Sequence, residues 1–475
     1  MSEPIVVRLD CPAHARAKAR YVFDTLFLAW RVRVAYDDTG EAPASIVYTT
    51  SEASVPDGAL GIYCSSRAWD FFSGQSDVID AGTAQGVPVV FDETAWPGSK
   101  PNLIRWDLPA NAFYFLSSWS ERIPPDRNSG SRAMCADSVF KRLYIPQTVV
   151  DDYACVLLAE LRSVHLPLRE RFELRNRWPD VRTFGVVLSH DEDFIPRGIG
   201  ETVTMGAKSV LRQLVTHRSL GDALRVSMAL LHAAMRGKNP YLTVPDLVRR
   251  EISCGVRASY QIAVASRHPN DVTYTIDDSS VQRYLQPILD AGFDMCLHGS
   301  YRSTERIEWY LEEVRTLGAY LARPLGSRQH YLSFHYDALF TAQEQAGIEY
   351  DMSMGYPDAC GSRSGFSHPY FPYNLAEDRP YRVLEIPLVL MDVTLRTYLG
   401  LSASEALPRI TEELKLLQRS GGCASVVWHP ILFGGARDPG YDALYWQLIE
   451  TVRELGGWAG DGRTVNQHIR AFLTG

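Results

Sequence analysis

Three short polar segments, each directly after an apolar run, hold the residue types that metal-assisted hydrolysis needs. They contain Asp191 and Asp193 in the first, His298 in the second and His429 in the third. Two aspartates at i and i+2 on an extended segment point the same way, which suits one as a metal ligand and the other as a general base. Imidazoles bind metals and carry protons at neutral pH. The three segments therefore predict a metal-dependent hydrolytic site.

Each segment alone has a plainer interpretation. The aspartates are compatible with a solvated acidic turn, and an isolated His298 or His429 is compatible with a structural histidine. However, the run at 183–188 is continuous and apolar, which is typical of a strand buried on both faces of a parallel sheet, and the runs at 293–297 and 424–428 are further strand candidates. The carboxyl ends of such strands meet at one edge, so a single shared site explains all three segments together.

The order of apolar runs along the 475 residues predicts at least two folded units. Residues 1–168 alternate short strands (5–7, 45–48, 61–63 and 87–91) with helices (13–30, 111–116 and 146–161), and we expect a smaller α/β domain of unknown role. The charged segment 169–177 is a predicted linker or boundary helix. Residues 178–475 add strands at 258–262 and 383–388. They predict a distorted (β/α) barrel with a helical insertion near 205–250.

Composition excludes several classes of protein. A net charge of -8 with scattered Lys and Arg argues against nucleic-acid binding, which needs a basic face. The N-terminal residues lack the basic-then-apolar pattern of a signal peptide, and no run of about 18 apolar residues occurs, so we expect a cytoplasmic protein without a membrane span. The eight cysteines are widely spread, which favours reduced thiols.

The region from about residue 180 to 475 resembles the polysaccharide deacetylase family, carbohydrate esterase family four. Its first motif matches Asp191 and Asp193, and the resemblance implies that Asp191 is the base and that Asp193 binds the metal. Its second motif begins with a metal-binding histidine, which matches His298. The segment 327–332 resembles the third motif, and Arg328 would orient the base.

The remaining family motifs fall in the C-terminal part of the chain. Asp392, in Leu390-Met391-Asp392-Val393, resembles the fourth motif. His429 takes the place of the family's general acid, which Asp392 would orient. Further segments are similar to one bacterial branch that carries an extra N-terminal domain, so the resemblance covers nearly the whole chain; these are 113–116, 126–132, 239–243, 298–301, 350–355 and 366–370.

One position departs from the family pattern. The second motif usually has two histidines at i and i+4, whereas Arg302 stands at the second position, and a guanidinium does not bind a cation. The third ligand is then another side chain such as His190 or His368, or a water, or the protein has lost catalysis. We expect a divalent metal, with zinc the usual choice for three ligands and an open position.

Five residues are candidates for substrate binding. Because Arg302 stands where the family has a histidine facing the site, we expect it to contact an anionic group such as a uronic acid. The segment 361–365 is either a substrate loop, with Arg363 and His368 at the sugar, or a simple surface loop. His330 is a further candidate, and Trp428 can stack on a sugar face, although aromatic residues beside strands are more often core.

These features together predict a metal-dependent hydrolase. By resemblance, the substrate is an N-acylated, in the first place N-acetylated, sugar of a bacterial surface polysaccharide or its precursor. A non-catalytic carbohydrate-binding homologue remains an alternative because of Arg302, and so does a metal-dependent hydrolase of another amide or ester.

Overall fold

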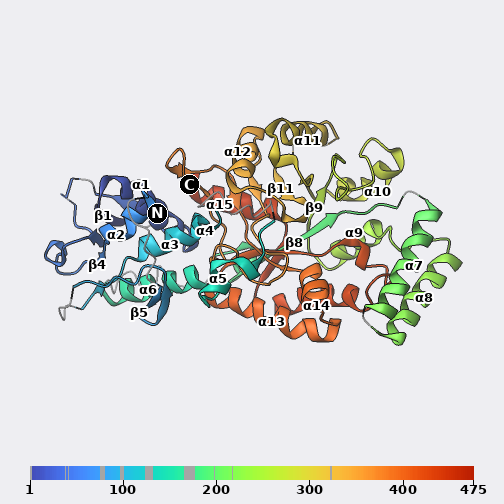
Figure 1. Cartoon of the computed structure of the whole chain (residues 1–475), viewed down its shortest axis with the longest axis horizontal. Helices are drawn as coiled ribbons and strands as arrows, with labels where there is room; N and C mark the ends of the chain where they lie inside the picture. Colours follow the sequence, from blue (N-terminus) through green and yellow to red (C-terminus); the bar gives the residue numbers. More distant parts are fainter. Residues whose placement is uncertain are drawn as a thin grey trace.

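The protein is described by a computed structural model. It describes residues 3–474 except for residues 38, 41, 75–80, 97–100, 123–131, 165–176, 197, 217 and 321–323. The predicted linker at 169–177 and the segment 126–132 therefore lie outside the described residues, apart from Arg177 and Arg132. The chain forms two parallel sheets, one from residues before 165 and one from residues after 176 (Figure 1).

The first sheet has five parallel strands in the order β2-β1-β3-β4-β7. The predicted strands near 5–7, 45–48 and 61–63 are confirmed as β1, β3 and β4, whereas the run at 87–91 contributes β6 to a separate antiparallel hairpin with β5. The strands are β1 (Ile5–Asp10), β2 (Val34–Tyr36), β3 (Ile46–Thr49), β4 (Leu60–Tyr63), β5 (Gly82–Ala84), β6 (Val87–Val89) and β7 (Leu103–Ile104).

Helices cover this sheet, and the predicted ones at 13–30, 111–116 and 146–161 are present as α1, α3 and α6. Their apolar faces share one core with the strands, and this core also takes four aromatic side chains from far along the chain, namely Tyr356, Phe366, Tyr370 and Tyr373. The helices are α1 (Ala13–Ala29), α2 (Ser66–Phe72), α3 (Leu108–Leu116), α4 (Trp119–Arg122), α5 (Val139–Arg142) and α6 (Val149–Val164).

The second sheet is a distorted (β/α) barrel. Its strands run in the order β15-β12-β11-β10-β9-β8-β17-β16, with β18 also paired to β8, and all these pairs are parallel. The two end strands, β15 and β16, are separated in the chain by Ile386 and Pro387 alone. Ile386 donates its N–H to Asp351 of β12, and Pro387 accepts from Ser425 of β17. The sheet therefore curls until its two edges meet.

The strands of the barrel alternate with helices, as the sequence predicts. The strands are β8 (Gly185–Glu192), β9 (Ser259–Ile262), β10 (Asp294–Gly299), β11 (Gly326–Gln329), β12 (Tyr350–Asp351), β15 (Leu384–Glu385), β16 (Leu388–Met391), β17 (Cys423–Val427) and β18 (Trp458–Gly460), with a separate hairpin of β13 (Tyr373–Asn374) and β14 (Arg379–Pro380). The helices after the insertion are α10 (Ser279–Asp290), α11 (Ile307–Tyr320), α12 (Tyr336–Ala346), α13 (Ala403–Ser420), α14 (Tyr441–Glu454) and α15 (Gly462–Thr474).

The helical insertion lies between β8 and β9 and consists of α7 (Ile199–Val215), α8 (Leu220–Met235) and α9 (Val244–Ser253). Helices α7 and α8 lie at the end of the molecule farthest from the first sheet (Figure 1). No described helix is both long enough and apolar enough to cross a bilayer. All eight cysteines are free.

Candidate active site

The carboxyl end of β8 carries the two aspartates. All eight residues of β8 are buried, as expected for a strand covered on both faces. Because successive side chains alternate, Asp191 and Asp193 both line a cavity of about 920 Å³ at this end of the barrel, as their spacing predicts. His190 points to the other face, where its ring nitrogens contact Trp428 O and Glu251 Oε1 at 2.6 and 2.9 Å. His190 is therefore not the third metal ligand.

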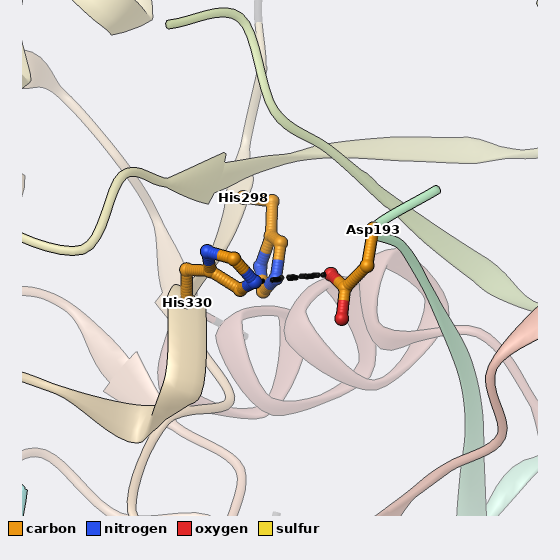
Figure 2. Close-up of side chains that lie close together, drawn as sticks. All are labelled: Asp193, His298 and His330. Atoms are coloured by element: carbon orange, nitrogen blue, oxygen red, sulfur yellow. Dashed lines mark ion pairs between the residues drawn. The ribbon is translucent and has the colours of Figure 1, made fainter. Parts of the chain in front are cut away.

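Asp193, His298 and His330 form a cluster whose ligand atoms all lie within 4.8 Å of one another. Oδ1 of Asp193 is 3.1 Å from Nε2 of His298 and 3.4 Å from Nε2 of His330. Figure 2 shows both imidazoles directed at this carboxylate from neighbouring strands. The third candidate ligand is thus His330, which follows β11 and was expected to bind substrate.

The chemistry of this cluster fits a divalent cation. Among the described residues, Oδ1 of Asp193 and Nε2 of His298 are buried and have no hydrogen-bond partner, an arrangement that is costly unless another group satisfies them. His298 places its Nδ1 3.0 Å from the carbonyl of Arg328, which fixes the proton there and leaves Nε2 available. Two imidazoles and one carboxylate with room for water suit zinc.

A second carboxylate lies close to His330. Oδ1 of Asp271 lies 3.8 Å from Nδ1 of His330, and three backbone amides, of Arg267, His268 and Tyr301, hold Asp271 at 2.7 to 2.8 Å. At 3.8 Å this contact is too long for a hydrogen bond, so Asp271 acts on His330 through charge attraction. Tyr331, the next residue, has a left-handed backbone (φ 58°), a strain often found beside functional groups.

Electrostatic effects in the cluster are large. Burial raises the pKa of Asp193, but the surrounding imidazoles, His330 first, outweigh burial and hold that pKa well below its usual value. Burial lowers the pKa of His330, whereas Asp193 and Asp271 raise it to about 9. Concentrated negative charge at Asp193 is what attracts a cation, which takes the place of the imidazole protons because a coordinating imidazole is neutral.

Arg328 holds Asp191. Its Nη1 donates to Asp191 Oδ1 at 2.5 Å, its Nη2 to Ser189 Oγ at 2.8 Å and its Nε to Met352 O at 2.9 Å. The guanidinium is fully buried, so all its contacts fix its direction. Oδ2 of Asp191 is turned toward the cluster, 3.9 Å from Nε2 of His298. This geometry agrees with a base that Arg328 orients.

His429 is held by Asp392. Helix α13 begins in a capping box at Ser402 and ends at Gly421 with a left-handed backbone, and the chain then enters β17, which delivers His429 at its carboxyl end. Nδ1 of His429 is 2.7 Å from Asp392 Oδ1, and its backbone N–H donates to Oδ2. Nε2 faces Asp193 at 3.3 Å.

The same contacts set the charge of His429. Burial lowers the pKa of its imidazole, but Asp392 and then Asp193 raise that pKa well above its usual value. Burial raises the pKa of Asp392, and His429 and Arg396 outweigh this effect and lower it. The pair therefore favours an imidazolium beside a carboxylate, which is the form that can donate a proton.

Two predicted substrate residues lie elsewhere. The expectation that Arg302 faces the cavity is wrong: its side chain is 51% exposed, pairs with Glu305 at 3.4 Å and does not line the cavity. His368 is buried near the amino end of β17, where Ser367 O accepts from Cys423 N, so it lies at the opposite edge of the sheet. Burial, together with nearby Arg177 and Arg31, lowers its pKa to about 3. His368 is therefore not a metal ligand.

Two more substrate predictions are also wrong in their geometry. Arg363 is buried against α4, where its Nη2 donates to Glu121 Oε2 at 2.8 Å, so it links the two halves of the chain and does not reach the cavity. Trp428 is fully buried in the barrel core, and its Nε1 donates to Tyr441 O at 3.0 Å. Strand alternation explains this position, because His429 faces the cavity and its neighbour must face the core.

Some cavity residues had no sequence signal. The cavity is also lined by Asp271, Arg132, Arg212, Arg396 and Arg437. Arg212 belongs to the insertion, Arg396 lies in the π-helical turn Thr394–Tyr398 and the others lie outside the helices, so only the fold brings them to the site. His330 directly follows β11, while His298 lies near the carboxyl end of β10 and His429 just after β17, but the sequence of β11, Gly-Ser-Arg-Gln, does not have the apolar pattern that marks those two strands.

The chain is similar in structure to a "putative polysaccharide deacetylase" from Mycobacterium smegmatis, known from a crystal structure, with 18% sequence identity and a TM-score of 0.41. The alignment covers 62% of this chain and 93% of the neighbour. No family model and no curated protein sequence matches the chain.

Proposed function

We propose that the chain is a metal-dependent hydrolase that removes an N-acyl group, in the first place acetyl, from a sugar of a bacterial surface polysaccharide or its precursor. One observation carries the proposal. A single cavity holds a cation-binding cluster with unsatisfied ligand atoms, a carboxylate oriented by arginine and an imidazole oriented by carboxylate. The family motifs around Asp191, His298, Arg328 and Asp392 support the choice of reaction.

Asp193, His298 and His330 would hold the metal, in the first place zinc. When bound, such a cation supplies Lewis-acid polarisation of the acyl carbonyl and lowers the pKa of a bound water. Asp191 removes the proton from the attacking water, because its Oδ2 is turned into the cavity while Arg328 holds Oδ1.

His429 donates a proton to the departing nitrogen. An amine leaves poorly as an anion, so amide cleavage needs an acid near that nitrogen. Asp392 holds Nδ1 and favours the imidazolium, and Nε2 carries the proton that faces the cavity. The base and the acid thus lie beside the same cation-binding cluster. Oδ2 of Asp191 is 3.9 Å from Nε2 of His298, and Nε2 of His429 is 3.3 Å from Oδ2 of Asp193.

The non-catalytic alternative rests on the lack of a third ligand at Arg302. His330, which directly follows β11, would supply a third ligand, and this candidate favours the catalytic proposal over the non-catalytic alternative. A further alternative is a hydrolase of another amide or ester, which the same groups would serve.

Metal analysis combined with an amine-release assay tests the proposal. We expect purified protein to carry a divalent transition metal near one equivalent, and to release a free amine from N-acetylated amino sugars. Loss of the amine signal after chelation, and its return with zinc, would support the metal assignment. Amine release that persists without bound metal, or metal-loaded protein that cleaves only other amides, would contradict it.

A further inference from the structure

Three arginines gather around one carboxylate on the wall of the cavity. Oδ2 of Asp438 accepts a hydrogen bond from Nη1 of Arg396, and it lies 3.6 Å from Nη1 of Arg212 and 3.9 Å from Nε of Arg437. All three arginines line the same cavity as His429. Three guanidinium groups against one carboxylate leave this cluster with two positive charges in excess.

The nearby groups do not remove this excess. Asp392 is the other carboxylate close to Arg396, but it is bonded to His429, whose imidazolium offsets it. Burial first, and repulsion from Arg396 next, lower the pKa of Arg437 to about 10. These cations are therefore held together at an electrostatic cost.

The arginines also have unused donors. Arg396 is 7% exposed and lies in the π-helical turn Thr394–Tyr398, a form often found at functional sites. Its buried Nε, and that of Arg437, have no hydrogen-bond partner within the part of the chain that the structure describes. Buried donors without acceptors, facing a cavity, are suited to an anionic ligand.

We infer that Arg212, Arg396 and Arg437 form a subsite for a phosphate group on the substrate, so that the substrate is an N-acylated amino sugar phosphate. The inference rests on the proposed function for the sugar, but the anion site stands on its own contacts. A phosphate dianion matches the two excess charges and offers several acceptor oxygens to the guanidinium groups. The site replaces Arg302 as the place of anion recognition.

Calorimetric binding of N-acetylglucosamine 1-phosphate and of N-acetylglucosamine tests the subsite. We expect wild type to bind the phosphorylated sugar at least about tenfold more tightly, the equivalent of one charge-assisted contact. Arg212→Gln and Arg437→Gln should lose this preference and keep the affinity for the neutral sugar. These two arginines suit the test because neither makes a hydrogen bond to Asp438. Arg249→Gln, on the exposed face of α9, is the matched control.

Further measurements separate phosphate binding at the arginines from phosphate binding at the metal. His298→Ala should keep the preference, because it alters the metal cluster and leaves the arginines intact; loss of preference there would assign the phosphate to the metal and overturn the subsite. Equal affinity of wild type for both sugars, or for glucuronic acid and the sugar phosphate, would also overturn it. A phosphate preference without any amide cleavage would retain the subsite and count against the proposed function.

A different part of the molecule carries a second, independent inference. Ten of the eighteen large apolar side chains that are exposed among the described residues lie on α7 and α8. On α8 they recur at steps of three or four residues, and on α7 they recur at steps of four, eight, three and one, so each helix presents one apolar stripe to solvent. The stripe on α7 is Ile199, Val203, Leu211, Leu214 and Val215, and that on α8 is Leu220, Leu224, Met228, Leu231 and Met235.

The charge around these stripes is basic. Residues 197–238 contain seven Lys or Arg and two Asp or Glu, a net charge of +5 in a chain whose total is -8. Every exposed Lys, Arg, Asp or Glu between residues 199 and 238 of the described chain is basic, namely Lys208, Arg218, Arg225, Arg236 and Lys238. Apolar stripes bordered by Lys and Arg are typical of helices that lie in the surface of an anionic bilayer.

A second copy of the chain is a poorer occupant of this surface. A symmetric contact places the same patch on both subunits, so these basic groups would face one another. The hairpin also reaches the site, because Arg212 and Thr216 at the carboxyl end of α7 line the cavity. A lipid surface under α7 and α8 would thus lie beside the cavity, at the end of the molecule away from the first sheet (Figure 1).

We propose that α7 and α8 dock the protein on the surface of an anionic membrane. Sedimentation with vesicles tests this, with phosphatidylcholine alone compared with phosphatidylcholine mixed with phosphatidylglycerol. Wild type should bind the anionic vesicles and lose binding at high salt. Leu211→Ser combined with Leu224→Ser and Leu231→Ser should abolish binding, whereas Leu473→Ser, an exposed leucine on α15, should not.

Light scattering on the same proteins completes the test. A wild-type monomer that binds anionic vesicles supports the membrane surface. A dimer that the triple substitution converts to a monomer, with no vesicle binding in either form, would overturn it in favour of contact between copies. Equal binding to both kinds of vesicle would also overturn it, because the basic residues would then have no role.

Discussion

The two sheets of this protein differ in how the buried polar groups at the carboxyl ends of their strands are hydrogen-bonded. In both, polar side chains gather at the carboxyl ends of parallel strands. In the first sheet, Asp107 is fully buried and accepts hydrogen bonds from Tyr48, from the backbone of Ser65 and from the backbone of Ala110, all at 2.8 Å. In the barrel, the ligand atoms of Asp193 and His298 are buried without such partners.

This difference separates a structural cluster from a candidate active site. The carboxylate of Asp107 caps α3 and links it to β3 and to the end of β4. Its oxygens therefore already accept hydrogen bonds from within the fold. The carboxylate of Asp193 is directed at two imidazoles in an open cavity, so its bonding capacity is left for a ligand. Buried donors or acceptors without hydrogen-bond partners therefore indicate a candidate active site better than the mere presence of polar residues at a sheet edge.

The largest expected effect concerns the base in the barrel. Asp191→Asn should lower amide turnover by about a hundred- to ten-thousand-fold, because an amide cannot take the proton from water. Metal content should stay unchanged, since Asp191 is outside the cluster of three ligands. Steady-state kinetics with metal analysis measures both. Wild-type turnover in this variant would remove Asp191 from the proposed mechanism.

The next effect compares the metal affinity of two histidine variants, one at the cluster and one away from it. His330→Ala should weaken metal binding by more than about tenfold, since it removes a ligand and not only an orienting group. His190→Gln is the control, because His190 is bonded to Glu251 and Trp428 away from the cluster. Competition with a chelator measures affinity. Equal affinity in wild type and His330→Ala would exclude His330 as the third ligand.

A smaller effect is expected on folding from the first sheet. Asp107→Ala should lower the free energy of unfolding by about 3 kcal/mol, because buried donors lose their acceptor. Its kcat should match wild type. Asp193→Ala should cost less stability, since its buried Oδ1 accepts no hydrogen bond among the described residues. Denaturant titration compares the two variants, and the reverse order would contradict the contrast between the sheets.

The smallest effect is on the pH dependence of stability. Burial raises the pKa of Asp107 from 3.8 to about 7, so the folded state keeps a proton that the unfolded state loses near pH 4. Stability from this group is greatest below about pH 4 and falls as the pH rises toward 7. Asp107→Asn should therefore show a smaller fall in Tm between about pH 4 and pH 7 than wild type. An unchanged fall would mean that Asp107 does not titrate in this range.

Much of the site could be predicted because its residues follow apolar strands. Asp191, Asp193, His298 and His429 lie in one cavity, as the strand ends predict. His330 differs from these residues, because β11 has the sequence Gly-Ser-Arg-Gln, which lacks the apolar pattern of a buried strand. Its parallel pairing with β10, which places His330 beside His298, depends on the register of the sheet.

The wrong assignments have a common physical cause. Arg302, Arg363, His368 and Trp428 were placed at the site from their side-chain chemistry and their motifs, but the direction of each side chain depends on packing. Trp428 fills the core, and Arg363 is drawn to Glu121 from the first half of the chain. The arginines that do line the cavity come from loops, from the π-helical turn Thr394–Tyr398 and from the insertion, where sequence patterns carry no information on proximity.

The four aromatic rings that the C-terminal half lends to the first core also affect biosynthesis. Tyr356 emerges 192 residues after Val164, the last residue of α6. At about 5 to 20 residues per second, the ribosome needs roughly 10 to 40 s to reach it. During that interval the core of the nascent N-terminal half is incomplete, and the apolar surface that these rings cover is exposed. Chaperones bind exposed apolar surface of this kind. A fragment of residues 1–168 made alone should therefore bind the dye ANS strongly; a tightly folded fragment that does not bind the dye would show that these rings are dispensable.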